Sequence, residues 1–345
     1  MLATFYSTWM EQLLAGPIPA ETKATCDNCA MLPQPGSGLA NISFHPQTKC
    51  CTFEPQLPNY RVGLILSSND PALAAGRLTV EQRLRARIAV NPCGMDVSGR
   101  FLLLYNNSPN GFGRAPDLGC QHQIEGRCGI WPYHPATCST WFCKHDRGAT
   151  GQEFWQALSV LLNEVDRQLS LWCALEMGCD AAGLVSGHGA TAKVNPAELG
   201  APVDEGLYAR LWGRWAGHEA ELYRGCAELV RPLAWNDVTR ICGPQVTAMA
   251  GVVGQRFGKL TGPAATDSLR LGLIQIEGVA AGKLRVVTYS EYDPLQMPQE
   301  LASALPHFDG RPVAEVLAEL REKKSLGLSG ALVQRLVDFR ILVPG

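Results

Sequence analysis

The chain has 345 residues, of which 46% are hydrophobic and 18% are charged, and its formal net charge is -2 at pH 7. This composition is typical of a globular protein and excludes an intrinsically disordered chain. The small negative charge gives no support to a nucleic-acid partner or to an acidic membrane surface, because either would favour an excess of basic residues.

The start of the chain does not resemble a secretory signal. Residues Met1 to Ala20 lack a positive beginning, and Glu11 and Gln12 interrupt their apolar stretch. No apolar run reaches the roughly 18 to 20 residues that a membrane-spanning helix needs. We therefore expect a cytoplasmic protein with no membrane partner. In a reducing cytosol the 13 cysteines are not expected to form a disulfide framework.

Residues 20–150 are rich in Cys, Pro, Gly and Asn and have little periodicity. This texture predicts an irregular, Cys-rich domain that a bound metal holds together. One helix is expected within it, from Val80 to Ala89, with Thr79 as its N-cap and Asn91-Pro92 at its end.

Residues 151–260 have helical periodicity and predict a helical middle domain. Apolar residues recur three and four apart between Gln152 and Glu176, which predicts an amphipathic helix. The segment from Gly178 through Gly189 is rich in glycine and predicts a flexible link. Two further helices are expected, from about Glu205 to Val230 and from about Trp235 to Phe257.

Residues 283–345 predict a small αβ module. Leu284 to Tyr289 is a short β run, Ala314 to Arg321 and Ala331 to Phe339 are helical, and Ile341 to Val343 form a closing strand. This order fits a winged-helix-like module, although many other small domains share it. The module has no cysteine, so we expect it to be separable and to offer a surface to a protein partner. The whole chain is thus expected to be mixed α+β.

Eight cysteines are grouped as a C-x-x-C pair, an adjacent pair and a dense later run. Thiolates bind zinc and the iron of clusters because both metals are soft enough to favour sulfur. Adjacent side chains of an extended backbone point to opposite sides, which fits two metals or opposite faces of a cluster. The grouping predicts an iron–sulfur cluster or zinc, either in two sites of four thiols or in one site with reserve thiols. The candidate ligands are Cys26, Cys29, Cys50, Cys51, Cys120, Cys128, Cys138 and Cys143.

The remaining cysteines and the histidines are given a simpler interpretation. Free cysteines are often small buried hydrophobic side chains, and we expect this of the five others: Cys93, Cys173, Cys179, Cys226 and Cys242. Nitrogen ligands are available in His45, His122, His134 and His145, but each is expected more often to be a hydrogen-bonding or surface residue.

No catalytic residue can be named from the sequence. Phosphate-binding loops, a dinucleotide fingerprint and a nucleophile motif are all missing. The C-x-x-C pair could be a dithiol redox catalyst or a ligand pair, and its spacing alone does not separate the two. The absence of a thioredoxin-like βαβ context favours the ligand pair.

A resemblance to a known family is carried by the segment Cys128-Gly-Ile-Trp-Pro-Tyr-His134-Pro135-Ala-Thr-Cys138-Ser. It resembles the C-x-I-Y-x-x-R-P-x-x-C-R segment of the YkgJ-type family, zinc- or iron-chelating "CxxCxxCC" proteins. The gap between the two cysteines is kept, as are Ile130 and Pro135, whereas His134 stands where Arg is usual. Cys120 matches the cysteine that precedes this segment.

The resemblance covers about a third of the chain and has two departures. Residues 30–49 separate Cys29 from the Cys50-Cys51 pair, where the family has only two residues, and Cys143 is an additional thiol. The resemblance implies binding of zinc or an iron–sulfur cluster. A distant branch resembles the flagellin lysine N-methylases, which allows methyl- or electron-transfer chemistry. The alternative is a structural zinc module that presents the helical and winged parts to a protein partner.

Overall fold

The structure is a computed structural model of the chain, and it describes residues 2–33, 42–180, 203–263, 267–280 and 282–345. The predicted link therefore lies almost wholly outside the described residues, from residue 181 onward. The protein is mixed helix and sheet, and all described strand pairs are antiparallel. Unit 1 comprises residues 1–18, 31–140 and 159–250, and unit 2 comprises residues 19–30, 141–158 and 251–345.

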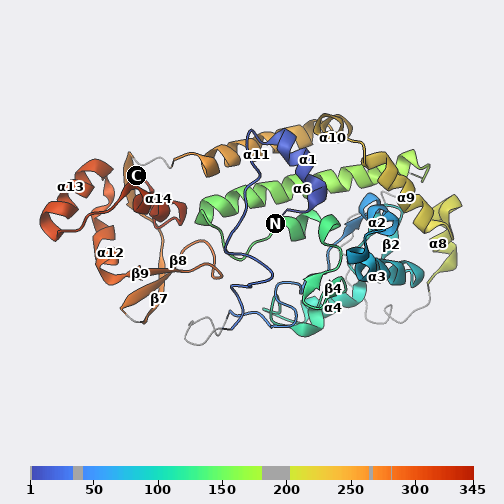
Figure 1. The fold of residues 1–345 in the computed structure, drawn as a ribbon, viewed down its shortest axis with the longest axis horizontal. Helices are drawn as coiled ribbons and strands as arrows, with labels where there is room; N and C mark the ends of the chain where they lie inside the picture. Colours follow the sequence, from blue (N-terminus) through green and yellow to red (C-terminus); the bar gives the residue numbers. More distant parts are fainter. Residues whose placement is uncertain (1, 34–41, 181–202, 264–266, 281) are drawn as a thin grey trace. The chain divides into compact units, whose positions relative to one another are not determined.

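The long helix α6, Gly148–Glu176, confirms the predicted amphipathic helix and begins four residues earlier. Its apolar stripe is buried, including Leu161, Val165 and Leu169. Helix α6 starts in unit 2 and continues through unit 1 (Figure 1).

Two helices from distant parts of the sequence pack closely in unit 1. Helix α2, Asn59–Ser67, is buried on all sides from Asn59 to Leu66, and it lies against α9, Glu219–Val230. A Cβ atom on Gly63 would lie 1.8 Å from the carbonyl oxygen of Tyr223. The absence of a side chain at Gly63 is therefore what allows this approach.

Two segments that the sequence predicts as single helices are each divided in the structure. The segment expected as one helix from Glu205 divides into α8, Glu205–Trp212, and α9, with Gly213 and Gly217 at positive φ between them. The next segment divides at Gly243 into α10, Trp235–Cys242, and α11, Pro244–Thr261. The other helices are α1 Thr4–Leu13, α3 Ala74–Arg85, α4 Gly99–Asn106 and α5 Ala136–Thr140.

The predicted start of the helix at Val80 is wrong, because α3 begins at Ala74. Asp70 accepts a hydrogen bond from the Ala72 amide and starts a 3₁₀ turn that leads into the helix. Thr79 is thus inside α3, and its hydroxyl donates to the Gly76 carbonyl instead of capping a helix.

Two small antiparallel sheets connect the helices of unit 1. In the first, β3, Gly94–Met95, lies between β1, Leu57–Pro58, and β2, Val90–Asn91. The second is a hairpin of β4, Gln123–Ile124, and β5, Arg127–Cys128. This hairpin carries one of the cysteines.

The C-terminal part of unit 2 builds its own core. The core includes Leu269, Phe308, Val316, Phe339 and Leu342, all at most 1% exposed. One sheet has the order β10-β6-β11 and the other β7-β8-β9. The strands are β6 Ser268–Leu271, β7 Gln275–Ala280, β8 Lys283–Val287, β9 Leu295–Pro298, β10 Asp309–Pro312 and β11 Leu342–Pro344.

The predicted β run, two helices and closing strand of this part are present as β8, α13, Val313–Lys324, α14, Gly330–Asp338, and β11. Helix α12, Gln299–Ala304, and the other strands were not predicted. The predicted domains 20–150, 151–260 and 283–345 stay a prediction, because the grouping into two units does not test whether each part folds alone. No helix among the described residues is long and apolar enough to cross a membrane.

Candidate functional site: a group of thiols in unit 1

The adjacent cysteines and the later run of cysteines are joined by backbone. The amide of Cys120 donates to the carbonyl of Cys51, with an N–O distance of 2.8 Å. The side-chain amide of Gln123 donates to the carbonyls of Gln47 at 2.9 Å and Thr48 at 3.1 Å. These bonds fix the turn before Cys51 against the start of the β4–β5 hairpin, although the two segments are about 70 residues apart in the chain.

The hairpin brings a third cysteine to the same place. Gln123 pairs with Cys128 across β4 and β5. The backbone N–H of Gln123 donates to the Cys120 carbonyl at 3.0 Å. The turn between the strands needs positive φ, which Glu125 and Gly126 adopt at 50° and 78°. Cys128 is therefore held beside Cys120 by short local pairing.

The fourth cysteine, Cys138, lies in α5, and a buried arginine positions the chain just before it. The Arg61 side chain is fully buried and donates to the carbonyls of Tyr133 and His134, at 3.3 and 3.2 Å. Its charge is balanced by Asp166 at 3.3 Å. Sequence reasoning did not single out Arg61 or Asp166, since neither belongs to a motif.

The thiols of these segments lie close enough to influence one another's ionisation. Burial raises the pKa of Cys120 to about 12, and negative charge on Cys128 or Cys51 raises it further. The pKa of Cys138 lies well above its usual value, first through burial and then through Cys120, Cys128 and Cys51. The Cys138 side chain is accessible to water even so. Cys51, Cys120, Cys128 and Cys138 thus form one group, here called the unit 1 thiol group.

Two hydrogen bonds favour the thiolate form in this group, where burial otherwise raises the thiol pKa. The peptide N–H of His122 donates to the Cys120 sulfur and lowers its pKa. The Cys50 thiol hydrogen-bonds to Cys51 and lowers its pKa, to which Lys49 adds. Cys51 is thus the member that ionises most readily.

The geometry of the adjacent cysteines differs from the expectation of opposite orientations. Lys49 has a φ of 51°, and the Cys51 amide donates to the Thr48 carbonyl at 2.9 Å. Cys50 is therefore part of a turn and not of an extended segment, which is why the two thiols can contact each other.

His122 has an unusual buried nitrogen. The hydroxyl of Thr79 donates its single hydrogen to the Gly76 carbonyl at 2.7 Å, so it must accept from Nδ1–H of His122, also at 2.7 Å. Nε2 is then an unprotonated acceptor, and it is buried without a hydrogen-bond partner. Burial and then the charge of Arg83 lower the His122 pKa to about 4, which keeps the ring neutral.

The other three predicted ligands belong to unit 2. Cys26 is exposed, whereas Cys29 and Cys143 are buried. Burial raises the pKa of Cys143 to about 12, and the nearby Cys29 raises it further, so these two thiols are also neighbours. His145 in the same unit is neutral, because burial lowers its pKa to about 4. The eight predicted ligands are therefore divided, with five in unit 1 and three in unit 2.

The thiols are not arranged as a metal site. Among the described residues, no group of three or more His, Cys, Asp or Glu side chains is placed so that it could hold a metal ion. Burial raises the pKa of Cys120 and Cys138, whereas the Cys50 thiol lowers that of Cys51. The predicted ligand set stays a prediction.

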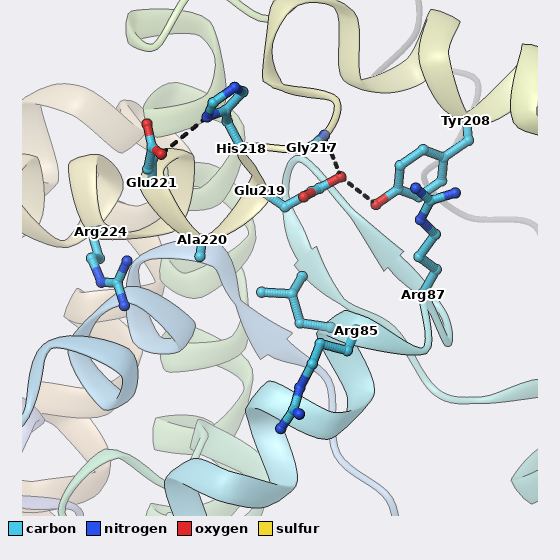
Figure 2. A pocket seen from close by; sticks show the side chains of 10 residues that line it. Arg85, Arg87, Tyr208, Gly217, His218, Glu219, Ala220, Glu221 and Arg224 are labelled. Carbon is cyan, nitrogen blue, oxygen red and sulfur yellow. Dashed lines mark hydrogen bonds and ion pairs between the residues drawn. The ribbon is translucent and has the colours of Figure 1, made fainter.

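A hollow elsewhere in unit 1 has a different chemistry. Its volume is about 330 Å³, and residues from the end of α3, from α8 and from the start of α9 line it. Glu219 accepts from Tyr208 and from the Gly217 amide, both at 2.8 Å, and the Arg87 guanidinium lies 4.4 Å from the Tyr208 ring centre (Figure 2). No cysteine lines this hollow.

The chain matches no family model, no curated protein and no solved structure. The resemblance seen at Cys120 to Cys138 thus rests on the residues themselves.

Proposed function

We propose that the unit 1 thiol group binds a metal, either zinc or an iron–sulfur cluster, through Cys51, Cys120, Cys128 and Cys138. The observation that carries this proposal is that three separate segments bring four thiols together and are tied by the bond from the Cys120 amide to the Cys51 carbonyl. Uncharged thiols gain little from such grouping, whereas four thiolates are the preferred donors of both metals.

The surroundings fit a metal better than they fit free thiols. An N–H donor to a ligand sulfur, such as that of His122 to Cys120, stabilises a thiolate and tunes the bound metal. The bare Nε2 of His122 is a further donor of the right kind, because a ligating histidine usually donates its other ring N–H to a fixed acceptor, as Nδ1 does here to Thr79. Zinc would supply structural stability, and a cluster would supply electron transfer or support for methyl transfer.

The other parts of the chain have a supporting role in this proposal. The protein is proposed to be cytoplasmic, where a thiolate site is not lost to disulfides. The C-terminal module, proposed to be winged-helix-like, would offer a partner surface; its self-contained core supports such a separate role. If the metal is structural zinc, the main function becomes the presentation of the helical and winged parts to a protein partner.

The decisive experiment is anaerobic purification followed by analysis of metal and acid-labile sulfide. Equimolar iron and sulfide with a brown chromophore would identify a cluster, and colourless protein with stoichiometric zinc would identify a structural site. Protein that is folded but binds neither metal, even after reconstitution, would contradict the proposal.

A matched pair of variants makes the assignment specific. Cys138→Ser is expected to remove the metal, whereas Cys242→Ser, at a buried thiol of α10 outside the group, is expected to keep it. His122→Gln tests the nitrogen donor, and a lower metal affinity with retained helical content is expected. Metal content is measured per folded chain, so that loss of fold is not mistaken for loss of a ligand.

A further inference from the structure

Four of the five cysteines that the sequence predicts to be simple hydrophobic side chains come together in unit 1. They lie on three segments: Cys93 in the turn between β2 and β3, Cys173 in the last turn of α6 with Cys179 three residues after its end, and Cys226 in α9. The Cys173 thiol donates to the Cys226 carbonyl, with an S–O distance of 3.8 Å. Cys93 and Cys179 pack into one apolar cluster with Ala174.

One side chain fixes the Cys93 turn against α6. The amide of Asn59 is fully buried and donates to the carbonyl of Pro92 at 3.0 Å and to that of Ser170 at 2.8 Å. Pro92 adjoins Cys93, and Ser170 lies one helical turn before Cys173. The distance between these two thiol-bearing segments is thus set by a rigid bridge.

A second side chain fixes the same turn against α9. The buried hydroxyl of Tyr223 lies 2.7 Å from the carbonyl oxygen of Asn91 and 2.9 Å from that of Gly94. These residues flank Cys93, and Tyr223 lies one helical turn before Cys226. The four thiols are consequently held together by the packing of α2, α6 and α9.

The surroundings favour a neutral product over a metal complex. Cys173 and Cys226 are 0% exposed, and Cys93 is 5% exposed in an apolar cluster. Four thiolates around a zinc ion would bring a net negative charge into this region, at a large cost in solvation. A disulfide carries no charge. The pKa of Cys93 is raised to about 12, first by burial, which agrees with a site that excludes thiolates.

We propose that Cys173 and Cys226 form a disulfide that joins α6 to α9, and that Cys179 is the thiol through which a peroxide oxidises the pair. Cys179 is the only half-buried member of the four, whereas the other three are buried. The guanidinium of Arg214 lies against the adjacent Gly178, where a Cβ would meet its Nη2 at 2.9 Å. Burial raises the pKa of Cys179 to about 11, and the charge of Arg214 opposes that rise and so favours the reactive thiolate.

The electrons and protons balance in three steps. The Cys179 sulfur attacks hydrogen peroxide, which breaks the O–O bond and leaves a sulfenic acid and water. The Cys226 thiol then attacks the Cys179 sulfur and releases the second water. Finally Cys173 attacks the Cys226 sulfur, and Cys179 leaves with the proton that Cys173 gives up. One peroxide is reduced to two waters while two thiols become one disulfide.

The test is mass-spectrometric mapping of the full chain after exposure to hydrogen peroxide. The folded protein is oxidised, unfolded, alkylated at its remaining thiols and digested without reductant. The expected product is a peptide pair linked through Cys173 and Cys226, which dithiothreitol separates. The oxidised chain should also have a higher melting temperature, because the bond closes a loop between residues 53 apart.

Variants separate the two parts of the proposal. Cys179→Ser should form the linked peptide several-fold more slowly, whereas Cys242→Ser should form it at the wild-type rate. Alkylation of both Cys173 and Cys226 in the oxidised protein, or a stable link between another pair, would overturn the disulfide. Wild-type kinetics in Cys179→Ser would overturn the role of Cys179. The mapping on the unaltered chain needs no variant, so poor folding of a variant leaves the main result intact.

Discussion

Arg61 shows how one buried residue can hold several segments of unit 1. Its guanidinium contacts the Asp166 carboxylate and the carbonyls that precede Cys138, and it lies 4.0 Å from the ring centre of Tyr6. The Asp166 carboxylate also accepts from the hydroxyls of Tyr6 and Tyr60, at 2.6 and 2.5 Å. A buried charge with four partners is expensive to disturb, because removing one leaves the others unpaired.

We predict that Arg61→Met lowers the free energy of unfolding by about 3–5 kcal/mol, because Asp166 then loses its only described cationic partner. Tyr6→Phe is the matched control. It removes a single hydrogen bond to the same carboxylate and should cost about 1.5 kcal/mol. Urea unfolding of both variants measures the difference. Equal losses would show that the charge of Arg61 is unimportant.

The Cys242 thiol predicts a dependence of stability on alkaline pH. Burial raises its pKa from 9 to about 12, so the unfolded chain releases this proton at a lower pH than the folded chain does. The stabilising contribution is complete below pH 9 and is lost as the pH rises from 9 to 12. Between pH 8 and 10, wild type should lose roughly 1 kcal/mol more of its free energy of unfolding than Cys242→Ala. Parallel urea titrations at the two pH values would show it, and identical losses would contradict it.

For single residues, the sequence shows which cysteines belong to a motif better than it shows which residues they contact in the fold. The dense run from Cys120 to Cys138 could be recognised because its spacing is unusual. Cys93 and Cys226 could not, since each stands alone in the sequence and only the packing of α2, α6 and α9 brings them together. The bare nitrogen of His122 was equally hidden, because it depends on the hydroxyl of Thr79 in another segment.

Among the helices, the contact between α2 and α9 depends on one missing side chain. We predict that Gly63→Ala destabilises the protein by about 2–3 kcal/mol, because the new methyl group would overlap the Tyr223 carbonyl and push the helices apart. Gly251→Ala in α11 is the control. A Cβ there meets nothing within 4 Å, so the better helix propensity of Ala should stabilise by about 0.5–1 kcal/mol. Thermal unfolding of both variants gives the comparison, and similar effects would contradict the close approach.

Helices with long apolar periodicity could be predicted, and their ends could not. The stripe from Trp155 to Trp172 is long enough to predict α6 to its last residue, although the helix begins four residues before the predicted start. The segments that follow Glu205 and Trp235 have the same periodicity, yet Gly213 and Gly243 adopt positive φ and break each into two helices. Periodicity indicates which face of a helix is buried. Where a helix ends within such a pattern depends instead on whether a glycine adopts a positive φ.

For the whole molecule, the sequence order hides how the chain is divided. Cys29 and Cys143 belong to unit 2, while the Cys50-Cys51 pair between them belongs to unit 1. The sequence predicts one contiguous Cys-rich domain for residues 20–150, because nothing in the local pattern indicates which distant segment each part will contact. Whether the eight thiols form two sites or one site with additional thiols therefore depends on long-range packing that a single sequence does not contain.

This division leads to a prediction for a chain that ends at Gly262. The candidate ligands Cys51, Cys120, Cys128 and Cys138 all lie in unit 1, whereas the removed residues form a separate core around Phe308. Metal content per folded chain should therefore be unchanged. The melting temperature should fall, because Asp338, the partner of Arg147 in unit 2, is removed.

Elemental analysis of the truncated and full chains measures this outcome, with full-length Cys138→Ser as the metal-free reference. The retained metal must also resist removal by a chelator as it does in the full chain, because a site that had lost a ligand would release it more readily. A truncated chain that keeps the helical signal of unit 1 but loses its metal would show that unit 2 is required for binding.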